Sequence, residues 1–135
     1  MGTIKNIFDV SGRAMAAQMI RLNTVASNLA NSNNISSTSE GAYRPLKPIF
    51  KTIYSDELKQ TGLSTVEAIR VERLQREPIK TYQPNHPAAD EEGYIFKAAV
   101  DMDEEMVEML ETQRQYTNNI EVLNTIRNLT MRTLQ

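Results

Sequence analysis

The sequence contains no cysteine and no tryptophan, and it has a single histidine among its 135 residues. Without cysteine the chain can form no disulfide, no catalytic thiolate and no thiolate-ligated metal site. One histidine excludes a pair of histidine ligands for zinc. A Ser-His-Asp triad would depend on His86 alone, which stands between Pro84 and Pro87 in a turn-rich stretch. We therefore interpret His86 as a turn residue that packs or caps locally.

Long hydrophobic runs and an excess of charge of one sign are also missing. No run approaches the roughly eighteen apolar residues of a membrane span, and the sequence does not begin with the basic segment, apolar core and cleavage site of a signal peptide. The net charge of −2 gives no hint of a basic face for nucleic acid. We expect no membrane span, no nucleic-acid partner and, if the protein is exported, a route without a cleaved leader.

Residues 103–134 contain neither glycine nor proline and carry apolar residues at helical spacing. Acidic residues at the start, among them Asp103 and Glu104, lie where the first turn and the helix dipole favour negative charge. We predict one long helix whose partner-facing row advances by alternating steps of three and four residues, the period of a coiled coil. This row consists of Met106, Met109, Gln113, Tyr116, Ile120, Leu123, Arg127, Thr130 and Leu134.

A second apolar row appears on another face of the same predicted helix. It consists of Val122, Ile126 and Leu129. A helix that is apolar on two sides is normally buried on two sides, and the chain has few other helices to cover both. We therefore predict that neighbouring subunits cover this row.

Another helix is predicted from residue 3 to about residue 31, where Gly12 is the only glycine and proline is absent. Its heptad row consists of Phe8, Met15, Leu22 and Leu29, with Ile4 and Val25 on the intervening positions. This pattern fits a core helix of an ordinary bundle, or a helix that pairs with the C-terminal one and packs laterally into a polymer. The second row on the C-terminal helix favours the polymer.

The middle of the chain differs in character from both ends. Asparagine and serine crowd residues 28–41, a composition that ends helices, and we expect Asn28 and Asn31 to fix the end of the first helix. This loop either binds neighbouring backbones or is a solvated linker. Strands are predicted at 49–54, 66–74, 79–82 and 94–96, with a loop at 56–64. A short helix stays open as an alternative for the second strand.

These patterns predict a mainly α protein. Long N- and C-terminal helices pair as a coiled-coil-like hairpin, and a small β element is inserted between them. Residues 1–35 together with 100–135 would form the terminal-helix domain, and residues 36–99 the inserted region.

The acidic residues form no recognisable catalytic or metal-binding pattern. Asp90, Glu91 and Glu92 lack the spaced oxygen ligands of an EF-hand loop, so we interpret them as a solvated turn. The acids of the C-terminal helix lie away from its partner-facing row and lack a Glu-x-x-His motif. The sequence predicts no enzyme, no cofactor and no metal ion.

Several motifs resemble a known family. Residues 22–31, Leu-Asn-Thr-Val-Ala-Ser-Asn-Leu-Ala-Asn, are similar to the N-terminal signature of the rod and hook proteins of the bacterial flagellum. Gly-Ala-Tyr-Arg at 41–44 with Phe50 resembles the stretch that follows in the rod subgroup. The most specific similarity to flagellar basal-body rod proteins lies at residues 86–95, 105–109, 114–116 and 119–124. The chain departs from the family at Asn34, where threonine is common, and at Ala98 and Ala99, where Pro-Asn is common.

The resemblance implies a structural subunit of the proximal rod, located in the periplasm and exported unfolded through the flagellar type III apparatus. It implies as partners the rod proteins FlgB, FlgF and FlgG, the base protein FliE and copies of the chain itself. The terminal helices would form an inner tube that transmits torque, and the β element would make outer contacts. The predicted inner interface consists of Phe8, Met15, Leu22, Val25, Leu29, Met106, Met109, Tyr116, Ile120, Leu123 and Leu134.

Two hypotheses from other classes stay open. A soluble helical adaptor or export-chaperone-like protein would use the same helix faces for a transient partner, and a stable dimer that does not polymerise would favour it. A wall-binding or wall-cleaving module would depend on the β element with Asp90 and Glu91, and sugar-dependent activity would favour it.

Overall fold

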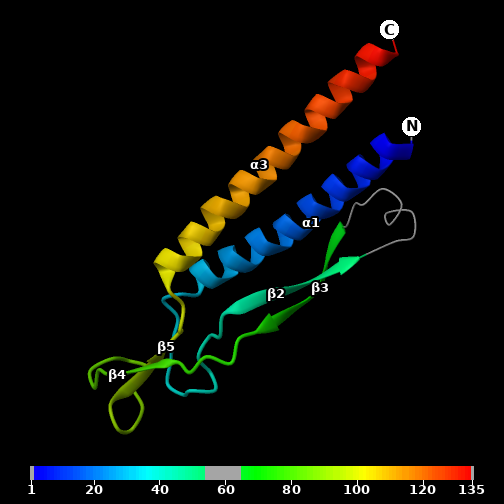
Figure 1. The fold of residues 1–135 in the computed structure, drawn as a ribbon. Helices are drawn as coiled ribbons and strands as arrows, with labels where there is room; N and C mark the ends of the chain where they lie inside the picture. The colour runs from blue at the N-terminus through cyan, green and yellow to red at the C-terminus, as the bar shows by residue number, and fades with distance from the viewer. Residues whose placement is uncertain (1, 54–64, 135) are drawn as a thin grey trace. The chain divides into compact units, whose positions relative to one another are not determined.

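Two long helices form the ends of the chain. The computed structural model describes residues 2–53 and 65–134, in which α1 spans Gly2–Ala30 and α3 spans Met102–Thr133. The strands between them are β1 (Ile35–Ser36), β2 (Leu46–Ile53), β3 (Thr65–Arg73), β4 (Ile79–Tyr82) and β5 (Tyr94–Lys97) (Figure 1).

The predicted fold class is confirmed: two long terminal helices contact each other and small β-sheets are inserted between them. Both helices begin and end within one residue of the predicted positions. The segment with two alternatives is a strand, β3. β1 was not predicted, because two residues carry no periodicity. The predicted loop at 56–64 lies outside the described residues.

The chain divides into two compact units. Unit 1 comprises residues 1–22, 48–70 and 110–135, and unit 2 comprises residues 23–47 and 71–109. Each long helix contributes residues to both units, and both chain ends belong to unit 1 (Figure 1).

In unit 1 the two helices run antiparallel beside each other (Figure 1). Asn119 Nδ2 on α3 donates a hydrogen bond of 3.1 Å to Gln18 Oε1 on α1. The guanidinium of Arg21 lies 5.1 Å from the ring centre of Phe50 on β2, a cation–π contact that ties the strand to α1.

Unit 2 contains a three-stranded antiparallel sheet in the order β1-β5-β4. Its central strand carries Ile95, which is completely buried. On the opposite face, the Tyr82 and Tyr94 rings meet edge to face at 5.2 Å, and Lys80 Nζ lies 4.2 Å from the centre of the Tyr94 ring. One face of the sheet thus packs inward, and the other carries an aromatic cluster with its cation.

The start of α3 is capped by its own sequence. Asp101 Oδ1 accepts hydrogen bonds from the backbone N–H groups of Asp103 at 3.0 Å and Glu104 at 3.2 Å. N–H groups in the first turn of a helix have no acceptor within the helix, so the Asp101 carboxylate satisfies them. Its negative charge also interacts favourably with the helix dipole. The predicted acidic helix start is therefore confirmed.

Candidate functional site

A buried asparagine joins three segments of unit 2. Asn28, in the last turns of α1, is only 2% exposed. Its Oδ1 accepts hydrogen bonds from the backbone N–H of Leu46 and from the Tyr43 hydroxyl, both at 2.8 Å. Its Nδ2 donates to the Leu46 carbonyl oxygen at 3.0 Å and to Glu105 Oε1 at 3.2 Å. We call Asn28, Tyr43, Leu46 and Glu105 the Asn28 cluster; both lone pairs and both protons of the amide are used.

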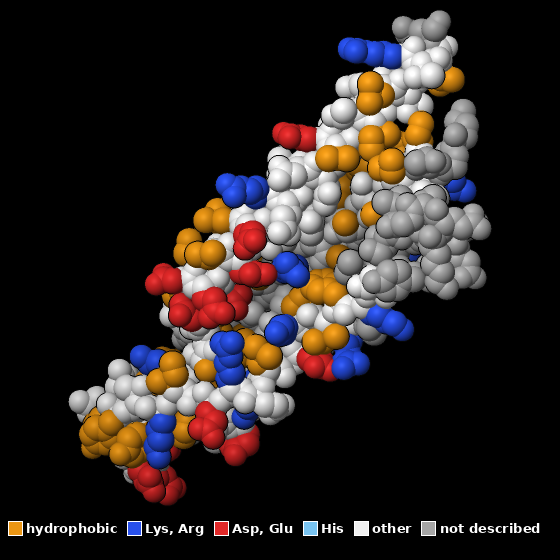
Figure 2. Space-filling model, viewed as in Figure 1, with side chains coloured by type: hydrophobic (Ala, Val, Ile, Leu, Met, Phe, Trp, Pro, Cys, Tyr) orange, Lys and Arg blue, Asp and Glu red, His pale blue; other side chains and the backbone are white. Residues whose placement is uncertain are grey.

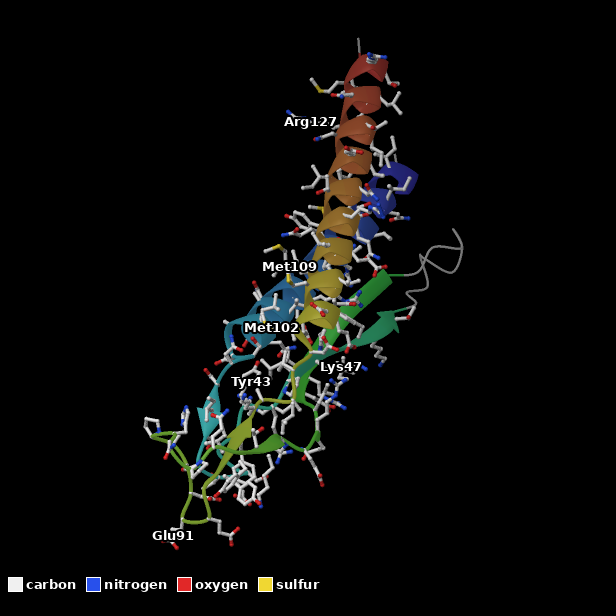
Figure 3. All side chains as sticks on the ribbon, turned by 90° about the vertical axis from the view of Figure 1, so that its left-hand side faces the viewer. Tyr43, Lys47, Glu91, Met102, Met109 and Arg127 are labelled. Carbon is white, nitrogen blue, oxygen red and sulfur yellow. The ribbon has the colours of Figure 1, made fainter. Side chains whose placement is uncertain are left out.

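Neighbouring side chains hold Tyr43 in this cluster. Its hydroxyl lies 3.1 Å from Ser27 Oγ, and the Arg73 guanidinium lies 5.7 Å from the centre of its ring. Figure 3 shows Tyr43 close to the end of α3 that carries Met102. Arg73 thus contacts the ring, while the hydroxyl lies beside Ser27 and donates to Asn28.

Burial raises the pKa of Glu105 above its usual value, because desolvation disfavours the charged carboxylate. Repulsion from Glu104 and Glu108 adds to this increase in pKa, whereas the hydrogen bond from Asn28 and the charge of Arg76 lower it. Glu105 is therefore the member of the cluster whose charge costs free energy in the folded state.

Asn31 acts at the end of α1. Its backbone N–H and its Nδ2 both donate to the Ser27 carbonyl oxygen, at 3.1 and 2.8 Å. Its Oδ1 accepts a hydrogen bond of 2.6 Å from Asn34 Nδ2. These bonds satisfy a carbonyl group of the last turn and start the following loop.

The most buried positions of the two helices are small or polar. With the exception of the apolar Val25, they are Ser11, Ala17, Thr24 and Asn28 on α1, and Thr112 on α3. The predicted row on α3 passes instead through Gln113, which is exposed. The buried side of α3 is therefore displaced from the predicted row at this position.

Large apolar side chains remain exposed along both helices. On α1 the exposed set is Ile4, Phe8 and Met19. On α3 it is Met102, Met106, Val107, Leu110, Ile120, Val122, Leu129 and Met131, and Leu134 follows directly after the helix. Figure 2 shows apolar side chains at the surface of the helices. Large apolar side chains that stay exposed in this number are typical of a surface that binds a partner.

An apolar groove of about 290 Å³ opens in unit 1 near the chain ends. Its lining residues are Ile4, Ile7, Ile126, Leu129, Thr130, Thr133 and Leu134. The groove therefore takes part of its lining from the predicted second row, Ile126 and Leu129, and part from α1.

The predicted interface residues differ in exposure within the single chain. On α1, Val25 is buried, Met15, Leu22 and Leu29 are half-buried, and Phe8 is exposed. On α3, Met109, Tyr116, Leu123 and Ile126 are half-buried, and Met106, Ile120, Val122, Leu129 and Leu134 are exposed. A single chain does not test contacts with another subunit, so the interface assignment stays a prediction.

The connection between β4 and β5 is organised by its own side chains. Asp90 Oδ1 accepts hydrogen bonds from the backbone N–H groups of Glu92 at 3.0 Å and Tyr94 at 2.8 Å. His86 Nδ1 accepts one of 3.0 Å from the N–H of Ala88, which confirms His86 as a turn residue. Glu91 stands at the tip (Figure 3). Within residues 2–53 and 65–134, no three acids or histidines are grouped as metal ligands would be.

Comparison with known proteins identifies the family. Residues 8–34 match the family described as flagella basal body rod protein, and residues 91–135 match the flagellar basal body rod FlgEFG protein C-terminal family. The flagellar basal-body rod protein FlgC of Salmonella typhimurium is 37% identical over 132 residues, which cover 96% of this chain and 94% of the relative. The chain belongs to the flagellar basal-body rod protein family.

Two further rod proteins extend the comparison. FlgC of Escherichia coli O157:H7 is 35% identical over 130 residues, covering 96% of this chain and 94% of the relative. FlgC of Yersinia enterocolitica is 35% identical over 135 residues, covering 98% and 96%. The similarity to rod proteins thus extends over nearly the whole chain.

As a member of the rod protein family, the chain is a structural, non-enzymatic component of the flagellar rod. The predicted resemblance is confirmed, because residues 22–31 lie within one family match and residues 105–124 lie within the other. The nearly full-length similarity favours a rod protein over the adaptor and the wall module. In the described part of this rod protein, neither helix combines the length and apolar character needed to cross a bilayer.

Sequence reasoning singled out Asn28 but missed its partners Tyr43, Leu46 and Glu105. Tyr43 was noted only as part of a rod-protein motif. Glu105 lies 77 positions from Asn28. Its place among the acidic residues in the first turn of α3 suggested only a favourable interaction with the helix dipole. The available signal was a polar residue at 28 beside the apolar positions Val25 and Leu29, which requires a buried partner.

Proposed function

We propose that this rod component belongs to the proximal rod, where its terminal helices polymerise to form the axial drive shaft and the wall of the export channel. Residues 1–35 with 100–135 form the inner tube in this proposal, and residues 36–99 make outer contacts. Relatives named as basal-body rod proteins support a place in the rod. The proximal position rests on the sequence motifs.

The observation that carries this proposal is the distribution of side-chain size on the helices. Small and polar residues such as Ser11, Ala17 and Thr112 lie in buried positions, while many large apolar residues of the helices stay exposed. Burying one large apolar side chain contributes roughly 1.5–3 kcal/mol. A neighbour that covers several of them supplies enough free energy to order and hold the helices.

The partners in this proposal are FlgB, FlgF, FlgG, the base protein FliE and further copies of the chain. The predicted inner interface would form the contacts around the tube. The second row, Val122, Ile126 and Leu129, would face an adjacent subunit. The exposed fractions of Val122 and Leu129, 47% and 56%, support an open face at this position.

The proposed location is the periplasmic part of the basal body, reached through the flagellar type III apparatus without cleavage of a leader. Passage through a narrow channel requires an unfolded chain. A sequence without cysteine suits this route, because no disulfide can trap a partly folded form.

Circular dichroism and sedimentation of the purified chain, alone and mixed with neighbouring rod proteins, test the proposal. We expect helix content and sedimentation coefficient to rise in the mixture. Leu123→Asp should remove this association, because it buries a charge at the predicted inner interface. A stable dimer that ignores the rod proteins would contradict the proposal and favour the adaptor.

A further inference from the structure

The Asn28 cluster connects distant parts of the sequence. Asn28 lies 15 positions from Tyr43, 18 from Leu46 and 77 from Glu105. All four residues belong to unit 2. One amide group therefore touches the end of α1, the segment that leads into β2 and the start of α3.

The side chain of Asn28 forms the two hydrogen bonds with Leu46 that the backbone of a neighbouring strand would form. It accepts from the Leu46 N–H and donates to the Leu46 carbonyl, so both backbone groups of the first β2 residue are satisfied by one side chain. A buried backbone group without a partner is costly. An apolar residue at position 28 would leave both groups unpaired.

The polarity of the amide matters as much as its shape. An aspartate at position 28 could still accept from Leu46 N–H and the Tyr43 hydroxyl, but it has no proton to donate. Its carboxylate would face the Leu46 carbonyl oxygen and Glu105 Oε1, which now lie 3.0 and 3.2 Å from Nδ2. Two attractive contacts would become repulsive.

The helix faces around Asn28 specify rotation only weakly. The buried positions of α1 nearest Asn28 are Thr24 and Val25, whose short side chains interlock less than long ones do. A single buried polar residue can fix the register of paired helices. Rotating α1 by one residue, about 100°, would carry the Asn28 amide out of reach of its partners.

We infer that Asn28 is a positioning residue for rod assembly. Its amide sets the rotation of the last turns of α1 relative to Leu46 and to the start of α3, and so determines which apolar side chains a neighbouring subunit meets. Asn28 is itself buried and acts through the segments it holds. The inference rests on the proposed function, because it concerns the surface that polymerises.

A reversal of hydrogen-bond polarity tests the inference. Asn28→Asp removes both donors, and adding Glu105→Gln supplies a new donor, the amide of Gln, to the carboxylate at position 28. The full-length variants are mixed with neighbouring rod proteins, and association is measured by sedimentation and helix content by circular dichroism. Asn33→Asp is the matched control, because it makes the same chemical change at an exposed loop position.

We expect Asn28→Asp to weaken association by about tenfold or more, because it leaves buried groups unpaired. Glu105→Gln alone keeps an acceptor oxygen for Asn28 Nδ2, so it should not weaken association. The double variant should recover part of the loss, because the Gln introduced at position 105 donates to the Asp at position 28 while the Leu46 carbonyl oxygen still lacks a donor. Equal association of Asn28→Asp and Asn33→Asp would overturn the inference. So would a loss that Glu105→Gln does not even partly recover.

The milder variant Tyr43→Phe covers the case in which Asn28→Asp does not fold. It removes one hydroxyl at the amide oxygen, so we expect unchanged helix content and association weakened about threefold, whereas no change would contradict the inference. If the unmodified chain fails to associate, the proposed function falls together with the inference. If the unmodified chain associates and the Asn28 and Glu105 variants show no coupling, the inference alone fails.

Discussion

Asn28 and Glu105 meet in one hydrogen bond, yet burial affects them in opposite ways. The neutral amide of Asn28 loses little by leaving water, because four hydrogen bonds replace its hydration. The carboxylate of Glu105 is partly desolvated beside Glu104 and Glu108, and its pKa is raised. The charge of Glu105 is therefore the one unfavourable feature of the Asn28 cluster.

Glu105→Gln should stabilise unit 2 in a pH-dependent way. Because the folded-state pKa of Glu105 lies above its usual 4.5, the ionised form destabilises the fold. This cost is absent below pH 4.5 and develops as the pH rises through the raised pKa. Urea unfolding should show that Glu105→Gln equals the unmodified chain near pH 4 and exceeds it near pH 7. Glu111→Gln, at an exposed position, is the control; a less stable Gln variant at neutral pH would contradict this assignment.

Gly93→Ala should destabilise the β4–β5 connection by about 1–2 kcal/mol. Gly93 has φ of +86°, and an added Cβ would lie 2.9 Å from Tyr82 Cε2 and 3.0 Å from Pro84 Cβ. Gly12→Ala is the matched control, because nothing lies within 4 Å of its Cβ position in α1, and alanine favours a helix. Urea unfolding should therefore show opposite signs for the two variants. A neutral Gly93→Ala would mean that the turn relaxes freely.

Individual residues were predictable where their role is local. The turn role of His86 followed from the nearby prolines. A hydrogen bond of 3.0 Å from the Ala88 N–H to His86 Nδ1 confirms this role. The partners of Asn28 could not be predicted, because a hydrogen bond across 77 positions leaves no trace in spacing or composition. The apolar positions beside it, Val25 and Leu29, indicate that the amide is buried and needs a partner, but not which residues supply it.

Among the elements, α3 is long, but its stability still depends on the cap at its first turn. Asp101→Ala should cost about 0.5–2 kcal/mol, because it removes the acceptor for two backbone N–H groups. Asp101→Asn keeps an acceptor oxygen and should be close to the unmodified chain. The stabilities of both variants can be measured by thermal unfolding, followed by the circular dichroism signal of helices at 222 nm. Equal losses in the two variants would show that charge, and not the cap, stabilises the helix start.

The extent of the helices was easier to predict than their buried faces. Residues 103–134 lack glycine and proline, so the boundaries followed directly. Which face is buried depends on what packs against the helix, and this does not follow from the helix's own periodicity. Thr112 is the most buried position of α3, whereas hydrophobic periodicity favoured the row through Gln113.

For the whole molecule, contact with neighbouring subunits would explain the exposed apolar side chains. This explanation agrees with both the sequence pattern and the family. A row such as Val122 and Leu129 would be a liability on a protein that works alone. Because the chain belongs to a family of rod components, we propose that this row makes contacts between subunits. The sequence indicated this before the fold was known, because two apolar rows on one helix exceed what one partner helix can cover.

Val122→Asp should separate folding from assembly. Val122 is 47% exposed in the single chain, so the variant should change the free energy of unfolding by no more than about 0.5 kcal/mol. In the rod the same aspartate would be buried without a partner, which costs several kcal/mol and should abolish co-sedimentation with other rod proteins. Asn128→Asp is the matched control: it adds the same charge at an exposed position of α3, on a face that carries neither predicted row, and should assemble normally. Normal assembly of Val122→Asp would place this row on the solvent side of the rod. Failure of Asn128→Asp as well would mean that charge on α3, and not the covered apolar face, controls assembly.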